Sequence, residues 1–230
     1  VVVAGGLSGL AAAAQASENG AKVVVFEKAE VVGGAANMGM GPLGLETKVQ
    51  KDMMIDISVE RAFKMFMNYT HWRVNANLVK KYFENSADTI EWLQDMGVEF
   101  AGAYKYFPKS EATWHIVAVN GGIGRNGGAI MTKALMDFAK ENDAEFYTTT
   151  PVQKLIIEDG KVCGVIAKTA DGEEIEARCK SVIICTGGAG DNPEMIKNRI
   201  GYTFRENMFN FAIPGLKGEG IKMAMDAGAA

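Results

Sequence analysis

The chain opens with VVVAGGLSGLAAAAQASENGAKVVVFEK (residues 1–28), and this stretch decides the fold. Three β-branched residues at its start predict a buried strand, and a glycine-rich turn comes next. An alanine-rich helix is expected from about Ser8 to Glu18, and a second apolar strand from Val23 to Phe26. Strand, tight turn, helix and strand in this order form the β-α-β unit that holds a dinucleotide.

Each part of this unit has an expected role. Gly6 lets the backbone approach a pyrophosphate, and Gly9 lets the helix sit close to the strand. The N–H groups at the helix start face the phosphate charge. Glu27 lies 18 residues after Gly9 and can accept hydrogen bonds from a ribose. Ala4 stands where the first glycine is usual, and alanine fits there if its φ stays negative. The alternative is a β-α-β unit with no ligand.

Composition sets wider limits. A length of 230 residues suits one large or two small domains, and 48% hydrophobic with 23% charged residues is typical of a globular protein. The net charge of −4 gives no reason to expect nucleic acid or an anionic membrane as partner. No apolar run approaches the roughly 20 residues of a transmembrane helix. The cysteines show neither metal spacing nor a disulfide pattern, so we expect inert thiols. They are Cys163, Cys179 and Cys185.

The chain starts within its first strand and has no initiator methionine. We therefore expect a fragment. An export signal would have been lost with the missing N-terminus, so the cytoplasm is favoured and an exported form stays open.

A second glycine-dense loop follows the second strand, in residues 28–42. A strand ending in Glu-Lys, then Gly33-Gly34 and a run of small residues, resembles the flavoprotein family of fumarate reductases and succinate dehydrogenases. The resemblance implies that this segment runs under the FAD pyrophosphate and past the isoalloxazine ring. Ala35 and Ala36 replace the usual Asn and Ser or Thr, which leaves backbone donors. Residues 28–50 contain no histidine, so the resemblance implies non-covalent FAD.

A second motif lies near the C-terminus. The apolar segment 181–185, expected to be a strand buried on both faces, ends in Thr186-Gly187-Gly188 and resembles the Ala-Thr-Gly-Gly of FAD enzymes. Two Asp-Gly pairs predict hairpin turns in a β meander between the motifs. In the family, the residue at Val152 usually contacts the adenine through its backbone. Together the motifs favour FAD over NAD.

The resemblance also covers Gly218-Glu219-Gly220, where the family has Gly-Asp-Gly or Gly-Glu-Gly next to the flavin. Glu219 matches the acid. The complete set of residues expected to contact FAD is Ala4, Gly5, Gly6, Leu7, Ser8, Gly9, Glu27, Lys28, Gly33, Gly34, Ala35, Ala36, Gly39, Met40, Gly41, Val152, Thr186, Gly187, Gly188 and Glu219.

The middle of the chain is predicted to be helical over residues 46–100, with helices at Val59–Tyr69, capped by Ser58, and Asn77–Met96, stopped by Gly97. Residues 101–126 are expected to be irregular. They contain His115, near where the family places flavin- or substrate-facing residues, so His115 is a candidate for proton handling. A structural histidine is the favoured alternative, because no carboxylate partner is evident nearby.

The expected fold is α/β, a Rossmann-like FAD-binding domain of the glutathione-reductase type with a parallel sheet, a flanking β meander and a helical insertion. The nucleotide-binding core is predicted at 1–45, 127–192 and 207–230, and the insertion at about 46–126. The resemblance implies a capping domain beyond residue 230, with the family's substrate-binding Arg and His residues and its proton-donating Arg.

Three functions compete. The first is an FAD-dependent oxidoreductase that reduces or oxidises a C–C bond next to a carboxylate or carbonyl, with an unsaturated or saturated carboxylate or an enone as substrate. An electron-donor protein is a further expected partner. The second is a flavoprotein oxidase of the L-aspartate oxidase type. The third is a non-catalytic nucleotide-binding module.

Overall fold

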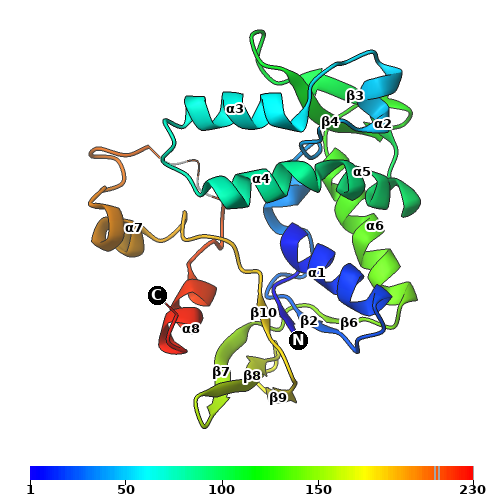
Figure 1. The fold of residues 1–230 in the computed structure, drawn as a ribbon. Coiled ribbons are helices and arrows are strands. Elements are labelled where there is room, and N and C mark those ends of the chain that lie inside the picture. Colours follow the sequence, from blue (N-terminus) through cyan, green and yellow to red (C-terminus); the bar gives the residue numbers. More distant parts are fainter. Residues whose placement is uncertain (210, 212, 230) are drawn as a thin grey trace. The chain divides into compact units, whose positions relative to one another are not determined.

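The computed structural model describes residues 1–209, 211 and 213–229 (Figure 1). The chain divides into two compact units, one of Val1–Ala35 with Met136–Ala230 and the other of Ala36–Leu135. The second unit starts earlier and ends later than the predicted insertion at 46–126. Residues 210, 212 and 230, which fall in the predicted core segment 207–230, lie outside the described residues.

The first unit is built on a four-stranded parallel sheet with the order β10-β1-β2-β6. Val2 of β1 lies between Val25 of β2 and Ile183 of β10, and β2 pairs in parallel with β6. The predicted α/β fold with a parallel sheet is confirmed. The strands are β1 (Val2–Val3), β2 (Val24–Phe26), β6 (Glu145–Tyr147) and β10 (Ile183–Ile184).

Helix α1 (Leu7–Glu18) connects β1 to β2 as predicted and packs against this sheet (Figure 1). Its buried face consists mainly of Leu10, Ala13 and Ala14, which have no exposed surface. Because alanine side chains are short, the helix axis can lie close to the strands, which positions its N-terminus beside the end of β1.

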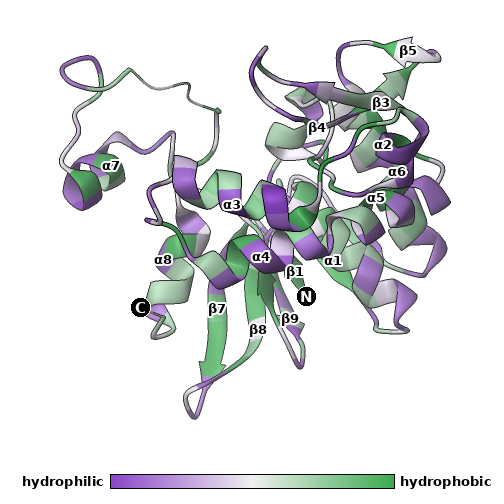
Figure 2. Cartoon of the chain, turned by 45° about the horizontal axis from the view of Figure 1, so that its top comes forward, coloured by the Kyte–Doolittle hydropathy of each residue, from purple (hydrophilic) through white to green (hydrophobic). Residues whose placement is uncertain are grey.

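The predicted β meander is confirmed as the antiparallel strands β7 (Val152–Glu158), β8 (Lys161–Lys168) and β9 (Glu174–Arg178). Positive φ at Asp159 (49°) and Gly160 (74°) forms the first hairpin turn. Figure 2 shows β7 and β8 largely in the hydrophobic colour. Buried side chains of β8, β1, β2 and the last helix share one core, made of Val3, Phe26, Val165, Ala167 and Met223.

Two helices complete the first unit. Helix α7 (Pro193–Ile200) has the Asn192 side chain as N-cap and Gly201, at φ 75°, as C-cap. Helix α8 (Glu219–Asp226) begins after Gly218, which also has positive φ.

The prediction that the last strand is buried on both faces is wrong. Ile183 is 43% exposed. The reason is topological, because β10 is the end strand of the sheet and pairs with β1 alone among the described strands.

The second unit contains α2 (Lys48–Asp52), α3 (Val59–Tyr69), α4 (Ala76–Glu84) and α5 (Ser86–Asp95), while the 3-10 helix η1 (Gly34–Met38) and α6 (Gly127–Glu141) each cross the boundary between the units. Helix α3 has the predicted bounds and the Ser58 cap. The single helix predicted over Asn77–Met96 is two helices, because Asn85 leaves the helical conformation and its side chain bonds to the Lys81 carbonyl. Gly97 ends α5 at φ 84°, as predicted.

The segment predicted to be irregular, 101–126, mostly forms antiparallel strands. These are β3 (Phe100–Lys105), β4 (Ala112–Val119) and β5 (Gly122–Ile123), in the order β3-β4-β5. The β4 sequence ATWHIVAV is rich in β-branched and aromatic residues, which favour a pleated, half-buried surface. The glycines and charged residues on either side obscured this signal.

Candidate cofactor site

The first two glycine bends lie side by side at the carboxyl ends of β1 and β2. The N–H of Gly33 donates to the carbonyl of Gly5 at 2.7 Å, and Gly6 and Gly33 form a parallel bridge. A Cβ added to Gly34 would lie 3.6 Å from the Gly6 Cα. The structure therefore gathers both bends at one sheet edge, where open α/β sheets bind their ligands.

The third bend, Thr186–Gly188, follows β10 and so reaches the same sheet edge. The start of α8 and the segment before it pack against this bend. A Cβ on Gly220 would lie 2.0 Å from the Thr186 Oγ1, and one on Gly187 would lie 3.1 Å from the Leu216 Cδ2. Glycine at 220 is required for this close approach, which the sequence motif at 218–220 did not reveal.

The N-terminus of α1 faces this edge without a side-chain cap from the described residues. Its first N–H groups have no partner within the helix and form a site for a negative charge. The N-cap residue is Gly6, at φ −68°, and a Cβ there would meet only the Cys185 carbonyl oxygen, at 3.9 Å. Neither backbone angle nor packing requires glycine at this position. Close approach by a phosphate does require it, so the site fits a dinucleotide. Side chains cap four of the other described helices, namely α2, α3, α4 and α7, through Thr47, Ser58, Asn75 and Asn192, whereas α5 and α8 have no side-chain cap.

Gly9 has the expected packing role. A Cβ on Gly9 would lie 2.0 Å from the Ala4 carbonyl oxygen and 3.3 Å from the Cys185 Cβ. Helix α1 can therefore meet β1 and β10 at this distance only with glycine at position 9.

The expectation of negative φ at Ala4 is wrong, because its φ is +78°. This is the left-handed region, where a Cβ costs about 1–2 kcal/mol. The turn after β1 thus keeps the conformation of its usual glycine while carrying an alanine.

Replacing Ala4 with glycine should raise the free energy of unfolding by about 0.5–1 kcal/mol, because relief of the left-handed strain exceeds the added freedom of the unfolded chain. Chemical denaturation measures this change in the free energy of unfolding. The same substitution at Ala11, inside α1, should lower stability by about 1 kcal/mol. If Ala4→Gly destabilises as Ala11→Gly does, Ala4 is not strained.

Glu27 is buried at the end of β2 and is 8% exposed. Its Oε2 accepts the Gly5 N–H at 2.7 Å, and its Oε1 accepts the Ala29 N–H at 2.8 Å. An ionised carboxylate accepts about four hydrogen bonds, so each oxygen keeps capacity for a ribose hydroxyl. The sequence pattern predicts ribose binding at Glu27 but did not reveal that this side chain also holds both flanking loops.

Lys28 and Glu219, both expected to contact FAD, form an ion pair at 2.7 Å. Burial opposes ionisation of Glu219, but hydrogen bonds from Lys28 and from backbone N–H groups outweigh it, so the pKa of this carboxyl is lowered. Val152, expected near the adenine, is the half-buried first residue of β7 and pairs with Ala167. The remaining expected residues of this unit, Leu7, Ser8 and Ala35, lie in α1 and in η1.

The remaining predicted flavin segment belongs to the second unit. In it the Gly39 N–H donates to the Ala36 carbonyl, and the Gly128 N–H donates to the Gly39 carbonyl at 2.9 Å. A Cβ on Gly128 would lie 1.9 Å from the Ala36 oxygen, and one on Gly41 would lie 1.8 Å from a backbone oxygen of β4. The Met40 carbonyl oxygen accepts a hydrogen bond from a backbone N–H of β4. The start of α6 and strand β4 thus fix residues 36–41.

His115 lies in β4 and has no exposed surface. Its Nε2 is 2.7 Å from the Thr47 Oγ1, and its Nδ1 is 3.1 Å from the Thr113 carbonyl oxygen. Phe100 packs edge-on against the ring. With both ring nitrogens partnered and no surface exposed, the geometry supports the structural alternative over proton handling.

Burial lowers the pKa of His115 from its ordinary 6.5, and the Thr113 hydrogen bond offsets only part of this. A lowered folded-state pKa means that stability is full above pH 6.5 and falls as pH drops below it. The midpoint temperature of thermal unfolding should therefore be lower at pH 5 than at pH 7.5. This decrease should be smaller in His115→Gln. His71→Gln, the matched control, should keep the full difference. An unchanged pH dependence in His115→Gln would contradict the buried neutral imidazole.

Glycine bends at the carboxyl ends of β1, β2 and β10, an uncapped helix and a buried acid after β2 define a dinucleotide-binding domain. The model of the family described as FAD binding domain matches residues 1–230. The chain belongs to this family, and FAD is its cofactor.

The relatives confirm the resemblance to fumarate reductases. Vinyl phenol reductase of Lactiplantibacillus plantarum is 32% identical over all of this chain and 45% of its own length. The NADH:fumarate oxidoreductase of Klebsiella pneumoniae is 27% identical over all of this chain and 24% of its own length. A cytochrome-type fumarate reductase of Shewanella frigidimarina is 28% identical, with 40% of its length covered.

Solved structures agree. A flavocytochrome c3 fumarate reductase in an open conformation matches all of this chain and 40% of its own, with a TM-score of 0.85 and 26% identity. The 3-ketosteroid Δ4-(5α)-dehydrogenase of Rhodococcus jostii matches all of this chain and 53% of its own, with a TM-score of 0.81 and 25% identity. The chain therefore spans about half or less of the length of each of these relatives.

The described residues offer neither a membrane-spanning helix nor a metal-binding cluster. None of their helices has the length and apolar character needed to cross a bilayer. They also contain no group of three or more His, Cys, Asp or Glu side chains arranged to hold a metal ion.

Proposed function

We propose that this chain is the FAD-binding part of a flavin-dependent oxidoreductase of the fumarate reductase type, and that it holds FAD non-covalently. The observation that carries the proposal is the meeting of the Gly5–Gly9 and Gly33–Gly34 bends at the uncapped start of α1. Backbone N–H groups of these bends would bind the pyrophosphate.

Side chains and neighbouring backbone would fix the rest of the cofactor. Glu27 would accept the adenosine ribose hydroxyls while it holds Gly5 and Ala29. Thr186–Gly188 would pass close to the cofactor, and Glu219 would lie near the flavin end. Residues 35–41 would supply backbone donors. Because the segment 28–50 has no histidine, no side chain there offers the usual covalent attachment.

Bound FAD supplies hydride transfer to or from a C–C bond, and the protein supplies binding and orientation. The substrate class is proposed from the names of the relatives, which include a fumarate reductase, a urocanate reductase and a vinyl phenol reductase. We propose a small unsaturated carboxylate, an enone or a related conjugated alkene. An electron-donor protein is the proposed partner.

The binding proposal is tested by reconstitution. Purified protein should become yellow with FAD and show the visible absorbance of oxidised flavin. Acid precipitation should then release the flavin into the supernatant, whereas covalent flavin would stay in the pellet. A protein that stays colourless with excess FAD and binds NAD instead would overturn the proposal.

Two assays separate the catalytic alternatives in the whole protein. Anaerobic oxidation of a reduced viologen by fumarate, urocanate or a vinyl phenol supports the reductase. Peroxide formed aerobically from L-aspartate supports the oxidase. FAD binding with neither activity would favour the non-catalytic module.

A further inference from the structure

Four charged side chains link three separate segments of the first unit beside the glycine bends. They come from the residue after Glu27, from the loop between β10 and α7, and from the segment leading into α8. We call this group the charged clasp, and it consists of Lys28, Asp191, Lys217 and Glu219.

Lys28 joins the first glycine-bend region to the start of α8. Its Nζ donates to the Glu219 carboxylate at 2.7 Å and also to the carbonyl oxygen of Gly215. One ammonium group thus binds both ends of the short segment 215–219.

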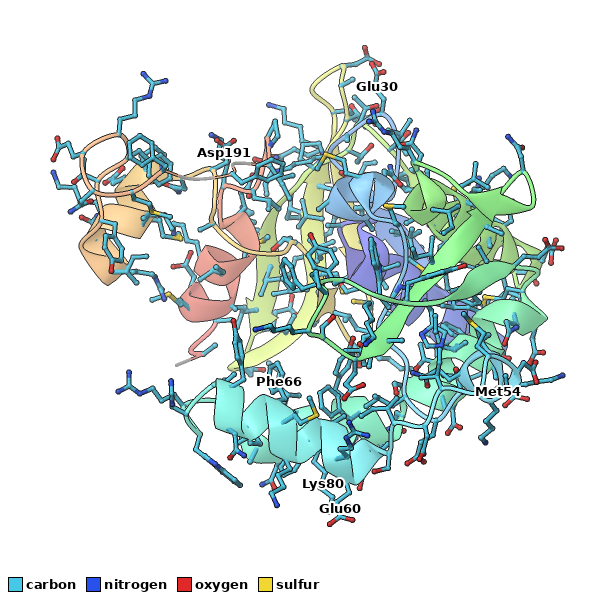
Figure 3. All side chains as sticks on the ribbon, turned by 90° about the horizontal axis from the view of Figure 1, so that it is seen from above. Glu30, Met54, Glu60, Phe66, Lys80 and Asp191 are labelled. Carbon is cyan, nitrogen blue, oxygen red and sulfur yellow. The ribbon has the colours of Figure 1, made fainter. Side chains whose placement is uncertain are left out.

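Asp191, labelled in Figure 3, binds the same segment. Its Oδ2 accepts the Gly215 N–H at 2.9 Å and pairs with the Lys217 Nζ at 2.9 Å. The Lys217 Nζ also donates to the Asp191 carbonyl oxygen at 2.7 Å. The backbone adds a further bond, from the Asp191 N–H to the Leu216 carbonyl at 3.0 Å.

Segment 215–219 needs such restraint. Gly215 and Gly218 both have positive φ, at 89° and 79°, so the backbone here has the wide freedom of glycine. No described residue in the segment is a fully buried large apolar side chain. Exposed ion pairs are individually weak, but here each lysine donates to two oxygen atoms, and Asp191 binds through side chain and backbone.

We infer that Lys28 and Asp191 are positioning residues, which hold segment 215–219 against the Thr186–Gly188 bend and so present Glu219 and this backbone to FAD in fixed places. The inference rests on the proposed FAD site. Lys28 acts through Glu219 and Gly215, and Asp191 acts through Gly215 and Lys217.

The charge of Asp191 makes the inference testable. FAD carries a negatively charged pyrophosphate, so removing a nearby carboxylate by Asp191→Ala would tighten FAD binding if only the local field mattered. Positioning predicts the opposite. We expect the Kd for FAD, from titration of flavin-free protein, to rise roughly fivefold to twentyfold in Asp191→Ala and in Lys28→Met.

Conservative variants separate positioning from a general loss of folding. Lys28→Arg keeps the charge and two donors and should restore the Kd to within about twofold of wild type. Asp191→Asn keeps an acceptor for Gly215 but loses the ion pair, so its Kd should lie between those of wild type and Asp191→Ala. The matched controls are Lys222→Met and Asp226→Ala, which break an ion pair on α8 outside the clasp and should leave the Kd unchanged.

The FAD titrations test the proposed function and the positioning role separately. If wild-type protein binds no FAD, the proposed function fails and the inference with it. If wild type binds FAD and Asp191→Ala binds it equally or more tightly, the clasp has no positioning role. If Asp191→Ala does not fold, the Kd of Asp191→Asn for FAD is measured in its place. The inference is overturned if this Kd and that of Lys28→Met both equal the wild-type value.

Discussion

Gly9→Ala should abolish FAD binding and lower the free energy of unfolding by about 3 kcal/mol. The added Cβ would lie 2.0 Å from the Ala4 carbonyl oxygen, which is backbone and cannot rotate away. Helix α1 must then move off the sheet, and its first N–H groups move with it. These groups and the Gly5–Gly6 bend form the proposed pyrophosphate site. The loss of stability and the loss of FAD binding should therefore occur together.

Titration with FAD and urea unfolding measure the two effects. Gly122→Ala is the matched control, because nothing lies within 4 Å of a Cβ added there. That variant should differ from wild type by less than about 0.5 kcal/mol and keep its FAD affinity. A Gly9→Ala protein that binds FAD normally would show that α1 does not need its close contact with β1.

Glu27→Ala should weaken FAD binding by about 1–3 kcal/mol, or roughly tenfold to a hundredfold in Kd, because it leaves buried polar groups unpaired. The structure gives two reasons. The ribose loses its acceptor, and the N–H groups of Gly5 and Ala29 lose theirs. The loops carrying both bends should therefore loosen even in the flavin-free protein.

Fluorescence titration with FAD measures the affinity, and hydrogen exchange at Gly5 and Ala29 measures the loosening. Glu27→Gln keeps one acceptor oxygen and should lie between wild type and Glu27→Ala. Glu30→Ala removes an exposed acid from the same loop (labelled in Figure 3) and should change neither quantity. Unchanged flavin occupancy in Glu27→Ala would remove this residue from the site.

Local signals in the sequence predicted the parallel sheet, the meander and most helix ends, since each depends on a few neighbouring residues. Three β-branched residues predicted β1, Ser58 predicted the start of α3, and Asp159-Gly160 predicted a hairpin. The glycine motifs that predicted FAD contacts lie together at one edge in the structure, because parallel strands carry their following loops to the same side.

What the sequence could not show depends on contacts between distant residues. The positive φ of Ala4 follows from the loop path fixed by β2 and Gly9, not from alanine itself. His115 appeared to lie in a loop because the flanking glycines and charged residues obscured the strand pattern, which becomes clear once β4 pairs with β3. The double role of Glu27 and the charged clasp join residues that are far apart in the chain, and no spacing pattern reports them.

The uncapped start of α1 would make the stability of this protein depend on the FAD concentration. Amides that lack an acceptor within the described chain gain one when FAD arrives, so each tenfold excess of FAD over its Kd adds about 1.4 kcal/mol to the folded state. At FAD concentrations below the Kd this contribution would vanish, and a larger fraction of the chain would be unfolded and open to proteolysis.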